Sequence, residues 1–457
     1  MTVGLSARQI VEESDSPLLA LAPWWSRVRL GDIADVQNGA PFESSHFNRT
    51  GTGVPLIRIR DVGSEDTSTY YSGPFAESYL VNNGDLLIGM DGDFRVARWT
   101  GRQGLLNQRV CRLVLRRPEI YSARLLSLVL QPYLDEINRR TSSITVKHLS
   151  SKTVAELPLP LPPRSEQDRL VDELERRLSH VDAAISGLRR SSALLDRLAT
   201  VVREAVANGS LLAMDISSWT KASAGDVTEV RGGIQKQPKR RPGVNAYPFL
   251  RVANVGRGVL DLKDVHRIEL FDGELKSYAL QQGDLLVVEG NGSPDQIGRA
   301  AMFDGSIADC VHQNHLIRVR PSDLLDARFL NFVWNAPSTV KQLVSVASST
   351  SGLHTLSTGK VKSVKLSIPP IRDQRLLVAE AERRLSLVFA ARRTVASDRT
   401  KAVALRRSLL AAAFSGQLVP QDEGDEPATV LLERIKASSP ADDGPVGRRS
   451  KRKEKVS

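Results

Sequence analysis

Apolar residues in two long stretches of the chain recur at alternating spacings of three and four, the pattern of a helix that packs along one narrow stripe. The first stretch runs from Pro163 to Asn208, with a pair of prolines and several acidic residues at its start and a glycine after its end, which are helix start and stop signals. The same pattern returns 207 residues further along. The predicted helix seam comprises Val181, Ala184, Leu188, Ser191, Leu195, Leu198, Val202 and Ala205 in the first helix, and Val388, Ala391, Val395, Asp398, Ala402, Leu405, Leu409 and Ala412 in the second.

Each predicted helix has ~45 residues and is therefore roughly 68 Å long. A stripe this narrow cannot stabilise an isolated helix in water. The simplest partner for each seam is the other seam, so we expect an antiparallel coiled coil, with a polar residue, Ser191 or Asp398, at the same step of both helices. The alternative is that each helix packs on its own domain, which suits the long, narrow seams less well.

The two helices belong to an internal repeat that covers most of the chain. The sequence ERRLS at Glu175–Ser179 returns at Glu382–Ser386, and the Gly-Asp pair that follows Trp25 returns after Trp219. The distance between equivalent positions grows from 194 residues early in the copies to 207 at their ends. A solenoid repeats every ~20–50 residues, so this period is that of a whole domain plus a long helix. We expect a pseudo-twofold internal repeat with variable domains on a constant frame.

The remaining stretches have the pattern of mixed domains. Apolar runs such as Leu56–Ile59 and Cys111–Leu115, punctuated by Gly and Pro, predict strands, while Ser122–Leu134 and Asp326–Val333 predict short helices. The expected class is α+β, with two tandem mixed α/β domains separated by the two long helices. The expected division is an N-terminal extension (1–22), domain 1 (23–162), helical region 1 (163–210), domain 2 (211–369), helical region 2 (370–416) and a C-terminal extension (417–457) with a short helix over 427–436 and a basic, disordered part from about 437.

Composition narrows the choice of partner and compartment. The 457 residues include 63 Lys and Arg against 52 Asp and Glu, a formal net charge of +11, which favours a polyanion such as nucleic acid as partner. Two cysteines suit a reducing compartment, and the N-terminal residues lack the apolar core of a signal peptide. No apolar run approaches the ~20 residues that a membrane span needs. We expect a cytoplasmic protein.

Polar side chains that can read bases or hold phosphates cluster where the predicted strands end. Arg pairs with guanine and Asn or Gln with adenine in the major groove, while Lys mostly holds phosphate. The basic run Gln235–Arg241 suits a loop that contacts phosphates, and the repeat places Asn107–Arg109 opposite His312–Asn314. The predicted DNA-binding residues are Arg58, Arg60, Asp61, Asp91, Asp93, Arg95, Arg98, Asn107, Gln108, Arg109 and Lys147 in domain 1, and Gln235, Lys236, Lys239, Arg240, Arg241, Arg251, Asn254, Asn291, Gln296, Arg299, Gln313, Asn314 and His354 in domain 2.

No catalytic or metal centre is recognisable in the sequence. Gly352–Lys360 resembles a phosphate-binding loop, but six residues instead of four separate its glycines, and Val361 follows the lysine. The cysteine and two histidines of Cys310–His315 lack the spacing of a zinc site. Neither HExxH nor GxSxG occurs, and the Pro-Pro pairs lack the flanking residues that amino-methyltransferases use. We therefore assign no catalytic residue, no metal and no bound cofactor to this chain.

Taken in order and twice over, these features resemble the specificity subunit of a type I restriction–modification enzyme. The resemblance covers about residues 23–435 and rests on the paired Trp and Gly-Asp openings, the GDLLIGMDGDF…LLNQRVCRL stretch, the two Pro-Pro-x-x-Glu/Asp-Gln helix starts and ALRRSLLAAAFSGQLVPQD. It implies two target-recognition domains, each reading half of a split double-stranded DNA sequence, and two helices that set the gap. It also implies two modification (methyltransferase) subunits that carry S-adenosylmethionine and methylate adenine, and restriction subunits that use ATP and Mg for translocation and cleavage.

Two other functions stay open at this point. A self-contained DNA methyltransferase or nuclease would need cofactor motifs that the sequence lacks, and methylation by the purified chain alone would support it. A coiled-coil scaffold that binds only proteins would not need domains with variable loops, and an absence of salt-sensitive DNA binding would support it.

Overall fold

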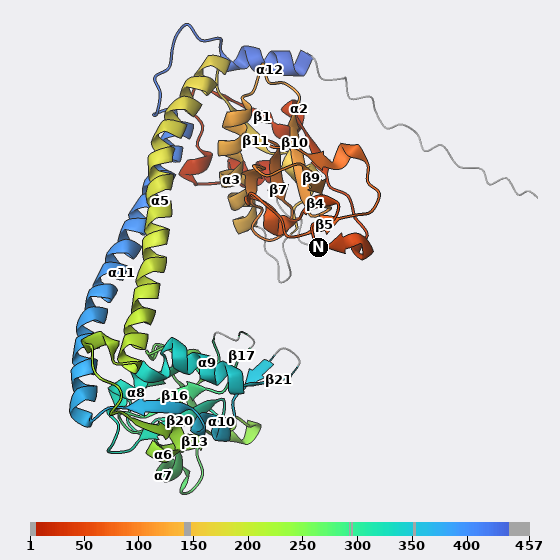
Figure 1. The fold of residues 1–457 in the computed structure, drawn as a ribbon. Coiled ribbons are helices and arrows are strands. Elements are labelled where there is room, and N and C mark those ends of the chain that lie inside the picture. The colour runs from red at the N-terminus through yellow and green to blue at the C-terminus, as the bar shows by residue number, and fades with distance from the viewer. Residues whose placement is uncertain (1–5, 141–147, 292, 294–295, 351–352, 438–457) are drawn as a thin grey trace, which may run out of the picture. The chain divides into compact units, whose positions relative to one another are not determined.

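The computed structural model describes residues 6–140, 148–291, 293, 296–350 and 353–437. The chain forms two compact units (Figure 1). Unit 1 contains Met1–Ile185 and Thr400–Ser457, and unit 2 contains Ser186–Arg399. Each unit therefore combines one mixed domain with part of each long helix. No helix in the described ranges is both long and apolar enough to span a membrane.

Unit 1 begins with a short helix, continues through short strands, and ends with helices. Its helices are α1 (Ala7–Glu12), α2 (Leu30–Ile33), α3 (Ala123–Arg140), α4 (Ser151–Ala155), the first half of α5 (Arg164–Ala207), the end of α11 (Ile371–Phe414) and α12 (Ala428–Ala437). Its strands are β1 (Ser26–Arg29), β2 (Ala34–Asn38), β3 (Phe47–Asn48), β4 (Val54–Ile57), β5 (Tyr70–Tyr71), β6 (Leu80–Val81), β7 (Leu86–Gly89), β8 (Val96–Arg98), β9 (Gly104–Leu106), β10 (Val110–Leu115) and β11 (Pro158–Leu161).

Unit 2 follows the same order. Its helices, apart from its parts of α5 and α11, are α6 (Ala224–Val227), α7 (Glu274–Tyr278), α8 (Ala327–Trp334), α9 (Pro337–Val346) and α10 (Thr358–Lys362). Its strands are β12 (Thr220–Ser223), β13 (Thr228–Gly232), β14 (Ala246–Leu250), β15 (His266–Glu269), β16 (Leu285–Val288), β17 (Gly290–Asn291), β18 (Ala300–Met302), β19 (Val311–His312), β20 (Leu316–Pro321), β21 (Ser348–Thr350), β22 (Leu353–Thr355) and β23 (Lys365–Ile368).

Two of the sheets have the same topology in both units. Each unit has a four-stranded antiparallel sheet, ordered β2-β10-β7-β8 in unit 1 and β13-β20-β16-β18 in unit 2, and a pairing of its domain's first and last strands, β1-β11 and β12-β23. The registers also correspond, because Val36 pairs with Leu113 in unit 1 and Val230 pairs with Val319 in unit 2. This agreement confirms the predicted α+β class and the internal repeat.

A second sheet in each unit contains short strands and the loops between them. Its order is β3-β5-β4-β9-β6 in unit 1 and β15-β14-β19 in unit 2. Each contains one parallel pair, β4 with β9 and β14 with β19, while the other pairs are antiparallel. Because these strands have only two to five residues, loops make up much of this part of each unit.

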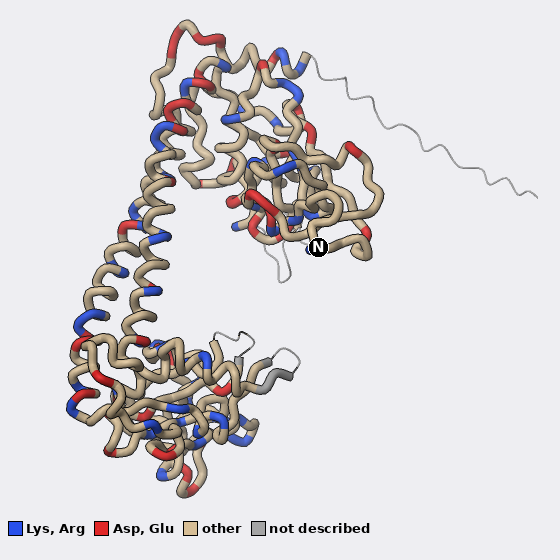
Figure 2. The backbone as a smooth tube through the Cα atoms, in the orientation of Figure 1, with Lys and Arg blue, Asp and Glu red and all other residues tan. Residues whose placement is uncertain are grey.

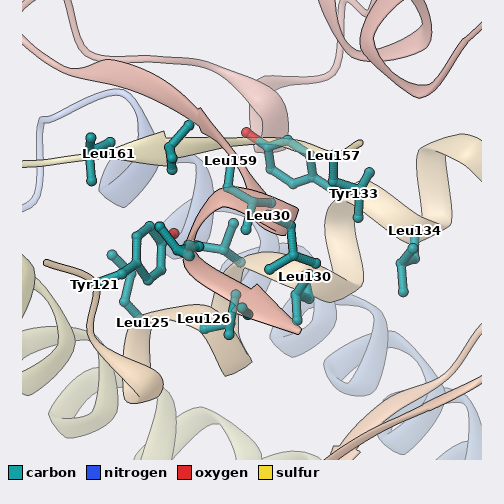
Figure 3. Close-up of a cluster of buried hydrophobic side chains, with 14 of the residues drawn as sticks. Leu30, Tyr121, Leu125, Leu126, Leu130, Tyr133, Leu134, Leu157, Leu159 and Leu161 are labelled. Atoms are coloured by element: carbon teal, nitrogen blue, oxygen red, sulfur yellow. The ribbon is translucent and has the colours of Figure 1, made fainter. Parts of the chain in front are cut away.

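The core of unit 1 is built from leucines and tyrosines of α3, α2 and β11 (Figure 3). Leu126, Leu130 and Leu134 recur every four residues along α3 and are buried, as is Leu159 of β11. Removing a leucine side chain of this kind from water stabilises the fold by about 1.5–3 kcal/mol. The helix predicted over Ser122–Leu134 is thus found, and it continues to Arg140, where two arginines pair with its own Glu136.

The two long helices run antiparallel. In unit 1, Leu170 and Leu174 near the start of α5 share a buried cluster with Leu410 near the end of α11. In unit 2, Val202 near the end of α5 shares a cluster with Leu377 near the start of α11. The predicted antiparallel pairing is therefore confirmed, and the side chains at the two ends of each helix also join a domain core.

Three positions of the predicted seam are exposed, and at two of them the next residue is buried instead. Leu198 is 47% exposed and Leu405 is 52% exposed, and Ala184 is exposed too, whereas their neighbours Ile185 and Ala199 are buried. Two alternative heptad seams can be drawn along each helix. They share every second position and differ by one residue at the positions between. At Ala184 and Leu198 both frames offer an apolar residue, so the sequence does not distinguish them there, whereas Leu405 is followed by Arg406, which is half-buried.

The middle of the helix pair contains no buried side chain. Residues 186–198 of α5 and 389–401 of α11 are all exposed or half-buried. Acidic and basic residues lie along both helices (Figure 2), and the charged residues of this middle part are mostly basic. Nearer the domains, neighbours pair within each helix, as Glu173 does with Arg176 and Glu380 with Arg383. Because these pairs are exposed to solvent, they add little to the stability of the helices. The ends of the two helices are therefore fixed by domain cores, while the middle has little burial of its own.

The two extensions of the chain both pack on unit 1. Ile10 of α1 and Leu431 of α12 are buried in its core, and Arg169 of α5 forms an ion pair with Asp425. The helix predicted over 427–436 is α12, and the residues from 438 onward lie outside the described ranges. Unit 1 is thus completed from both ends of the chain, while unit 2 is made of one continuous segment.

Candidate DNA interface

Backbone hydrogen bonds fix which residues of the two units correspond. The amide of Asn107 donates to the carbonyl of Ile57 at 3.3 Å, and the amide of Gln313 donates to that of Leu250 at 2.9 Å. Asn107 therefore corresponds to Gln313, and the predicted pairing of Asn107 with His312 is wrong by one residue. By the same pattern, Gln108 corresponds to Asn314 and Arg109 to His315.

The error has a structural reason. Equivalent residues are 206 positions apart at Asn107 and Gln313, but only 204 apart at Ser122 and Asp326, which receive the same contact from the long helices. The distance between equivalent positions therefore falls as well as grows, contrary to the prediction. Loops of the second copy are shorter in some places and longer in others.

A charged cluster lies beyond β7 in unit 1. Arg109 forms an ion pair with Asp91, whose other carboxylate oxygen lies 2.7 Å from Nδ1 of His148. Burial alone would raise the pKa of Asp91, but hydrogen bonds from His148 and Arg109 outweigh it and hold that pKa below its ordinary value. Because the Arg109 and His148 side chains are 56% and 63% exposed, both can still contact a ligand.

Unit 2 carries a different pair at the same place. The amide of Glu289 donates to the carbonyl of His315, as the amide of Met90 does to that of Arg109. Nδ1 of His315 lies 3.1 Å from a Glu289 carboxylate oxygen, and the histidine is 58% exposed. The backbone of this surface is therefore repeated while its side chains differ, which is the arrangement needed to read two different sequences.

Several predicted DNA-binding residues already serve the fold. Asp61 accepts a hydrogen bond from the amide of Arg58 at 3.0 Å, and Asn254 accepts one from the amide of Arg251 at 2.9 Å, so both brace the same turn. Burial is the main cause that raises the pKa of Asp61. Arg98 donates to the carbonyls of Gly84 and Ala123, and Arg299 to those of Val252 and Val255.

The structure places the predicted residues at three levels of exposure, and their DNA contacts stay predictions. The exposed ones are Arg60, Asp93, Arg95, Gln108, Arg109, Gln235, Lys236, Lys239, Arg241 and Gln296. The half-buried ones are Arg58, Asp91, Arg98, Arg240, Arg251, Arg299, Gln313, Asn314 and His354. The buried ones are Asp61, Asn107 and Asn254, while Lys147 and the side chain of Asn291 lie outside the described residues.

The basic run Gln235–Arg241 forms a loop with one turn of 3-10 helix at Pro238–Arg240. Arg240 is fixed there, because it donates to both carboxylate oxygens of Glu274 at 2.8 and 2.7 Å and stacks on Phe271. These hydrogen bonds lower the pKa of Glu274 to about 2. Lys236 and Arg241 on either side of Arg240 remain exposed. One arginine thus shapes the loop, and its basic neighbours face solvent.

Sequence reasoning missed four residues of these surfaces. They are His148, Glu289, His315 and Arg267. A repeat alignment shifted by one residue would have placed His315 opposite Arg109. Arg267 reaches the basic loop only through the pairing of β14 with β15, where it lies opposite Pro248, and that pairing leaves no signal in the sequence.

Cys310, which precedes β19, and His312 of β19 are part of the core. Cys310 and His312 are 0% exposed, and burial raises the pKa of the thiol to about 12 and lowers that of the imidazole to about 4. Across the described ranges, no three His, Cys, Asp or Glu residues are arranged to hold a metal ion. Cys310 and His312 therefore belong to the packed interior, while His315 of the same sequence group is exposed.

An apolar groove lies on the helix pair inside unit 2. It has a volume of about 380 Å³, and Val201 of α5 and Leu387 of α11 are 60% and 62% exposed in it. The positions 207 residues away in unit 1 are Ser408 and His180, which are polar. Exposed apolar side chains that gather in one place indicate a surface for another protein.

Both domains match one known family, and several known proteins are similar over most of the chain. Residues 24–185 and 216–379 each match the family described as "Type I restriction modification DNA specificity domain". The specificity subunit of the type I restriction enzyme EcoBI of Escherichia coli is 29% identical over 485 aligned positions, which cover 99% of this chain and 100% of that protein. The EcoKI specificity subunit of Escherichia coli strain K12 is 27% identical and covers 87% of this chain and 91% of its own.

A solved structure has a related fold. It comes from work titled "Structural basis underlying complex assembly and conformational transition of the type I R-M system", and it aligns with a TM-score of 0.57 over 87% of this chain and 99% of that chain. The sequence identity is 17%, so this likeness concerns the fold alone.

Proposed function

We propose, on the premise that this chain belongs to the family of type I restriction–modification DNA specificity subunits, that its two domains each read one half of a split double-stranded DNA target. The observation that carries the proposal is the repeated backbone with different exposed side chains, Arg109 with Asp91 and His148 in unit 1 against His315 with Glu289 in unit 2. Arg and His donors at such a surface can bond base edges or phosphates.

In this proposal the chain determines which DNA sequence the complex binds and performs no chemistry. Two modification subunits would bind S-adenosylmethionine and methylate adenine, and restriction subunits would bind ATP and Mg. The sequence motifs for these cofactors are missing from this chain, and its two cysteine thiols are buried. The long helices would set the gap between the half-sites, because a helix is a stiff spacer of fixed rise per residue.

The apolar groove of unit 2 suits a helix of a modification subunit. An amphipathic helix places its apolar side chains into such a groove, with anchors three and four residues apart. Val201 and Leu387 would contact these anchors, and Arg384 at the edge would meet polar residues of the partner. The polar residues Ser408 and His180 at the equivalent place of unit 1 would make the second copy bind more weakly.

The experiment is to express the chain with the modification subunit encoded beside it and to map methylated adenines across the host genome. A new motif with two short halves around a fixed gap is the expected result. Two alternative results would contradict the proposal: methylation by the purified chain without its partner, or no new motif although both proteins are soluble and associated.

A further inference from the structure

A basic cavity of unit 2 lies between the loop Gln235–Arg241 and strand β15. Its volume is about 600 Å³, and Lys236, Arg241, His266 and Arg267 contribute to its lining. All four side chains belong to exposed residues. The floor is apolar, with Phe249 and Ile268, which are 2% and 1% exposed. The cavity thus has buried apolar residues in its lining and cations around its edge.

The acidic residues near this cavity are already engaged. Glu274 is held by Arg240, and the carboxylate of Glu269 accepts hydrogen bonds from the amides of Gly243 and Asn245 at 2.7 and 2.9 Å. Among the described residues, no ion pair involves Lys236, Arg241 or Arg267; the guanidinium of Arg267 donates only to the carbonyl of Ala246. Three positive charges therefore remain without a counter-charge.

The same place in unit 1 carries mostly aromatic side chains instead of basic ones. Backbone bonds align the two loops: the amide of His46 donates to the carbonyl of Glu43 at 3.1 Å, as that of Arg240 does to Gln237 at 2.9 Å. Strand pairing aligns the facing strand, since a Pro of β4 or β14 pairs with Tyr70 in one unit and Arg267 in the other. The four corresponding pairs are Phe42 and Lys236, His46 and Arg240, Phe47 and Arg241, and Tyr70 and Arg267.

Phe42, His46 and Phe47 of unit 1 pack around the ring of Tyr71, while Tyr70 is covered by the guanidinium of Arg102, 5.2 Å from its ring centre. The ring of Phe42 lies 4.8 Å from that of Tyr71, and Phe47 and His46 lie 6.1 and 5.8 Å from the same ring. Aromatic rings at such distances attract one another in addition to the effect of burying their surface. One structural position is therefore used for packing in unit 1 and for exposed positive charge in unit 2.

We propose that the basic cavity of unit 2 binds backbone phosphates of DNA through Lys236, Arg241 and Arg267, and that unit 1 has no phosphate site at this place. This proposal rests on the proposed DNA-reading function and adds an asymmetry to it. Contacts to phosphate position a protein and carry no sequence information, and each one adds to the salt dependence of binding. Unit 2 then supplies three phosphate contacts at positions where unit 1 carries aromatic side chains.

The test uses the full chain in complex with its modification subunit and a duplex that carries the methylated target. The variant replaces three cations (Lys236→Gln, Arg241→Gln and Arg267→Gln), and Kd is measured between 50 and 200 mM salt. Each lost phosphate contact lowers the slope of log K against log salt by about 0.9, so the wild-type complex should lose about 40-fold more affinity over this range than the variant. The methylated motif should stay the same.

A matched control removes three other positive charges of unit 2 (Lys221→Gln, Lys341→Gln and Lys362→Gln), which are exposed and lie away from the cavity. Its salt slope should equal that of the wild type, and the single variant Arg241→Gln should lower the slope by about one contact. Three results would overturn the proposal that the cavity binds phosphates. They are an unchanged salt slope in the triple cavity variant, an equal drop of the slope in the control, and an altered half-site. Failure of the wild-type complex to bind DNA at all would instead contradict the proposed function.

Discussion

Gln167 accepts a hydrogen bond from the amide of Ser122 at 2.7 Å, and its own amide group donates to the carbonyls of Ile120 and Pro162 at 2.9 and 3.0 Å. The glutamine is 0% exposed. One side chain near the start of α5 therefore fixes the turn before α3 and the end of β11. This contact joins the recognition domain to the long helix.

The second copy repeats the contact. Gln374 accepts from the amide of Asp326 at 2.8 Å and donates to the carbonyls of Leu324 and Pro369 at 2.9 and 2.8 Å. It too is 0% exposed. The Glu/Asp-Gln pair found in the sequence after each Pro-Pro thus marks the joint between helix and domain.

The substitution Gln167→Ala should destabilise unit 1 by about 3 kcal/mol, because it leaves one amide and two carbonyls of the backbone without partners inside the core. Gln374→Ala should do the same to unit 2. Urea unfolding, followed by tryptophan fluorescence, measures the change. The control is Gln103→Ala, which loses one exposed hydrogen bond and should cost less than about 0.5 kcal/mol. Equal losses of stability for Gln103→Ala and Gln167→Ala would contradict the role of Gln167 in joining the domain to α5.

Glu166, the neighbour of Gln167, predicts a pH effect. It is 0% exposed and accepts from Nε1 of Trp24, and burial is the largest cause that raises its pKa. A carboxyl whose pKa is raised by folding adds stability below its unfolded pKa of about 4.3, and this stability is lost as pH rises through the folded pKa. The charge-free Glu166→Gln should therefore be more stable than the wild type at pH 7.

The measurement is the free energy of unfolding of both proteins between pH 4 and pH 8. The advantage of the glutamine variant should shrink toward pH 4, where the wild-type carboxyl gains its proton. Glu433→Gln, at an exposed position of α12, should show no such trend. A variant less stable than wild type at pH 7 would mean that the charged form of Glu166 is stabilised by its surroundings.

The sequence predicted the long helices and the internal repeat better than it predicted the surfaces proposed to contact DNA. The long helices and the repeat depend on apolar periodicity and on chain-local start signals, such as the Pro-Pro and Gln of each joint, and these are visible in one sequence. The sequence does not show which face of each helix is buried. Ala184 and Ile185 fit a heptad equally well, and so do Leu198 and Ala199. Only the burial against the partner helix distinguishes them.

The surfaces depend on contacts between distant residues. Arg267 joins the basic loop through strand pairing, and His148 joins Asp91 across 57 residues. Asp61 and Asn254 look like base-reading candidates in the sequence, but their side chains cap a turn. A polar residue at a strand end can serve either purpose, and the sequence alone does not say which.

The groove of unit 2 predicts the loss of one partner copy. The substitution Leu387→Glu places a charge among apolar side chains that a bound helix would bury, and an unpaired buried charge costs several kcal/mol. The assembled complex should fall from two modification subunits to one, as measured by native mass spectrometry. The control Leu324→Glu changes another exposed leucine, 65% exposed and outside the groove. A complex that keeps both copies would show that the groove is not the docking site.

Exchange of one domain should change one half-site. If residues 23–162 are replaced by the corresponding domain of a related specificity subunit, the joint at Gln167 keeps the new domain in register with the helices. The methylated motif should then have one new half, an unchanged second half and an unchanged gap. Methylome sequencing of the exchange variant measures all three. A change in both halves at once would contradict separate reading by the two domains.

The middle of the helix pair gives the most direct test of the spacing role. Residues 186–198 and 389–401 contribute no buried side chain, so seven residues can be inserted at the centre of both helices with little loss of packing. A heptad preserves the seam and lengthens each helix by about 10 Å. Because one base pair rises about 3.4 Å, the gap in the methylated motif should widen by about three base pairs, and both half-sites should keep their sequences. Insertion of seven residues in α5 alone is the control, since it breaks the register between the helices and should abolish methylation. An active double insertion with the original gap would show that some other element sets the distance between the half-sites.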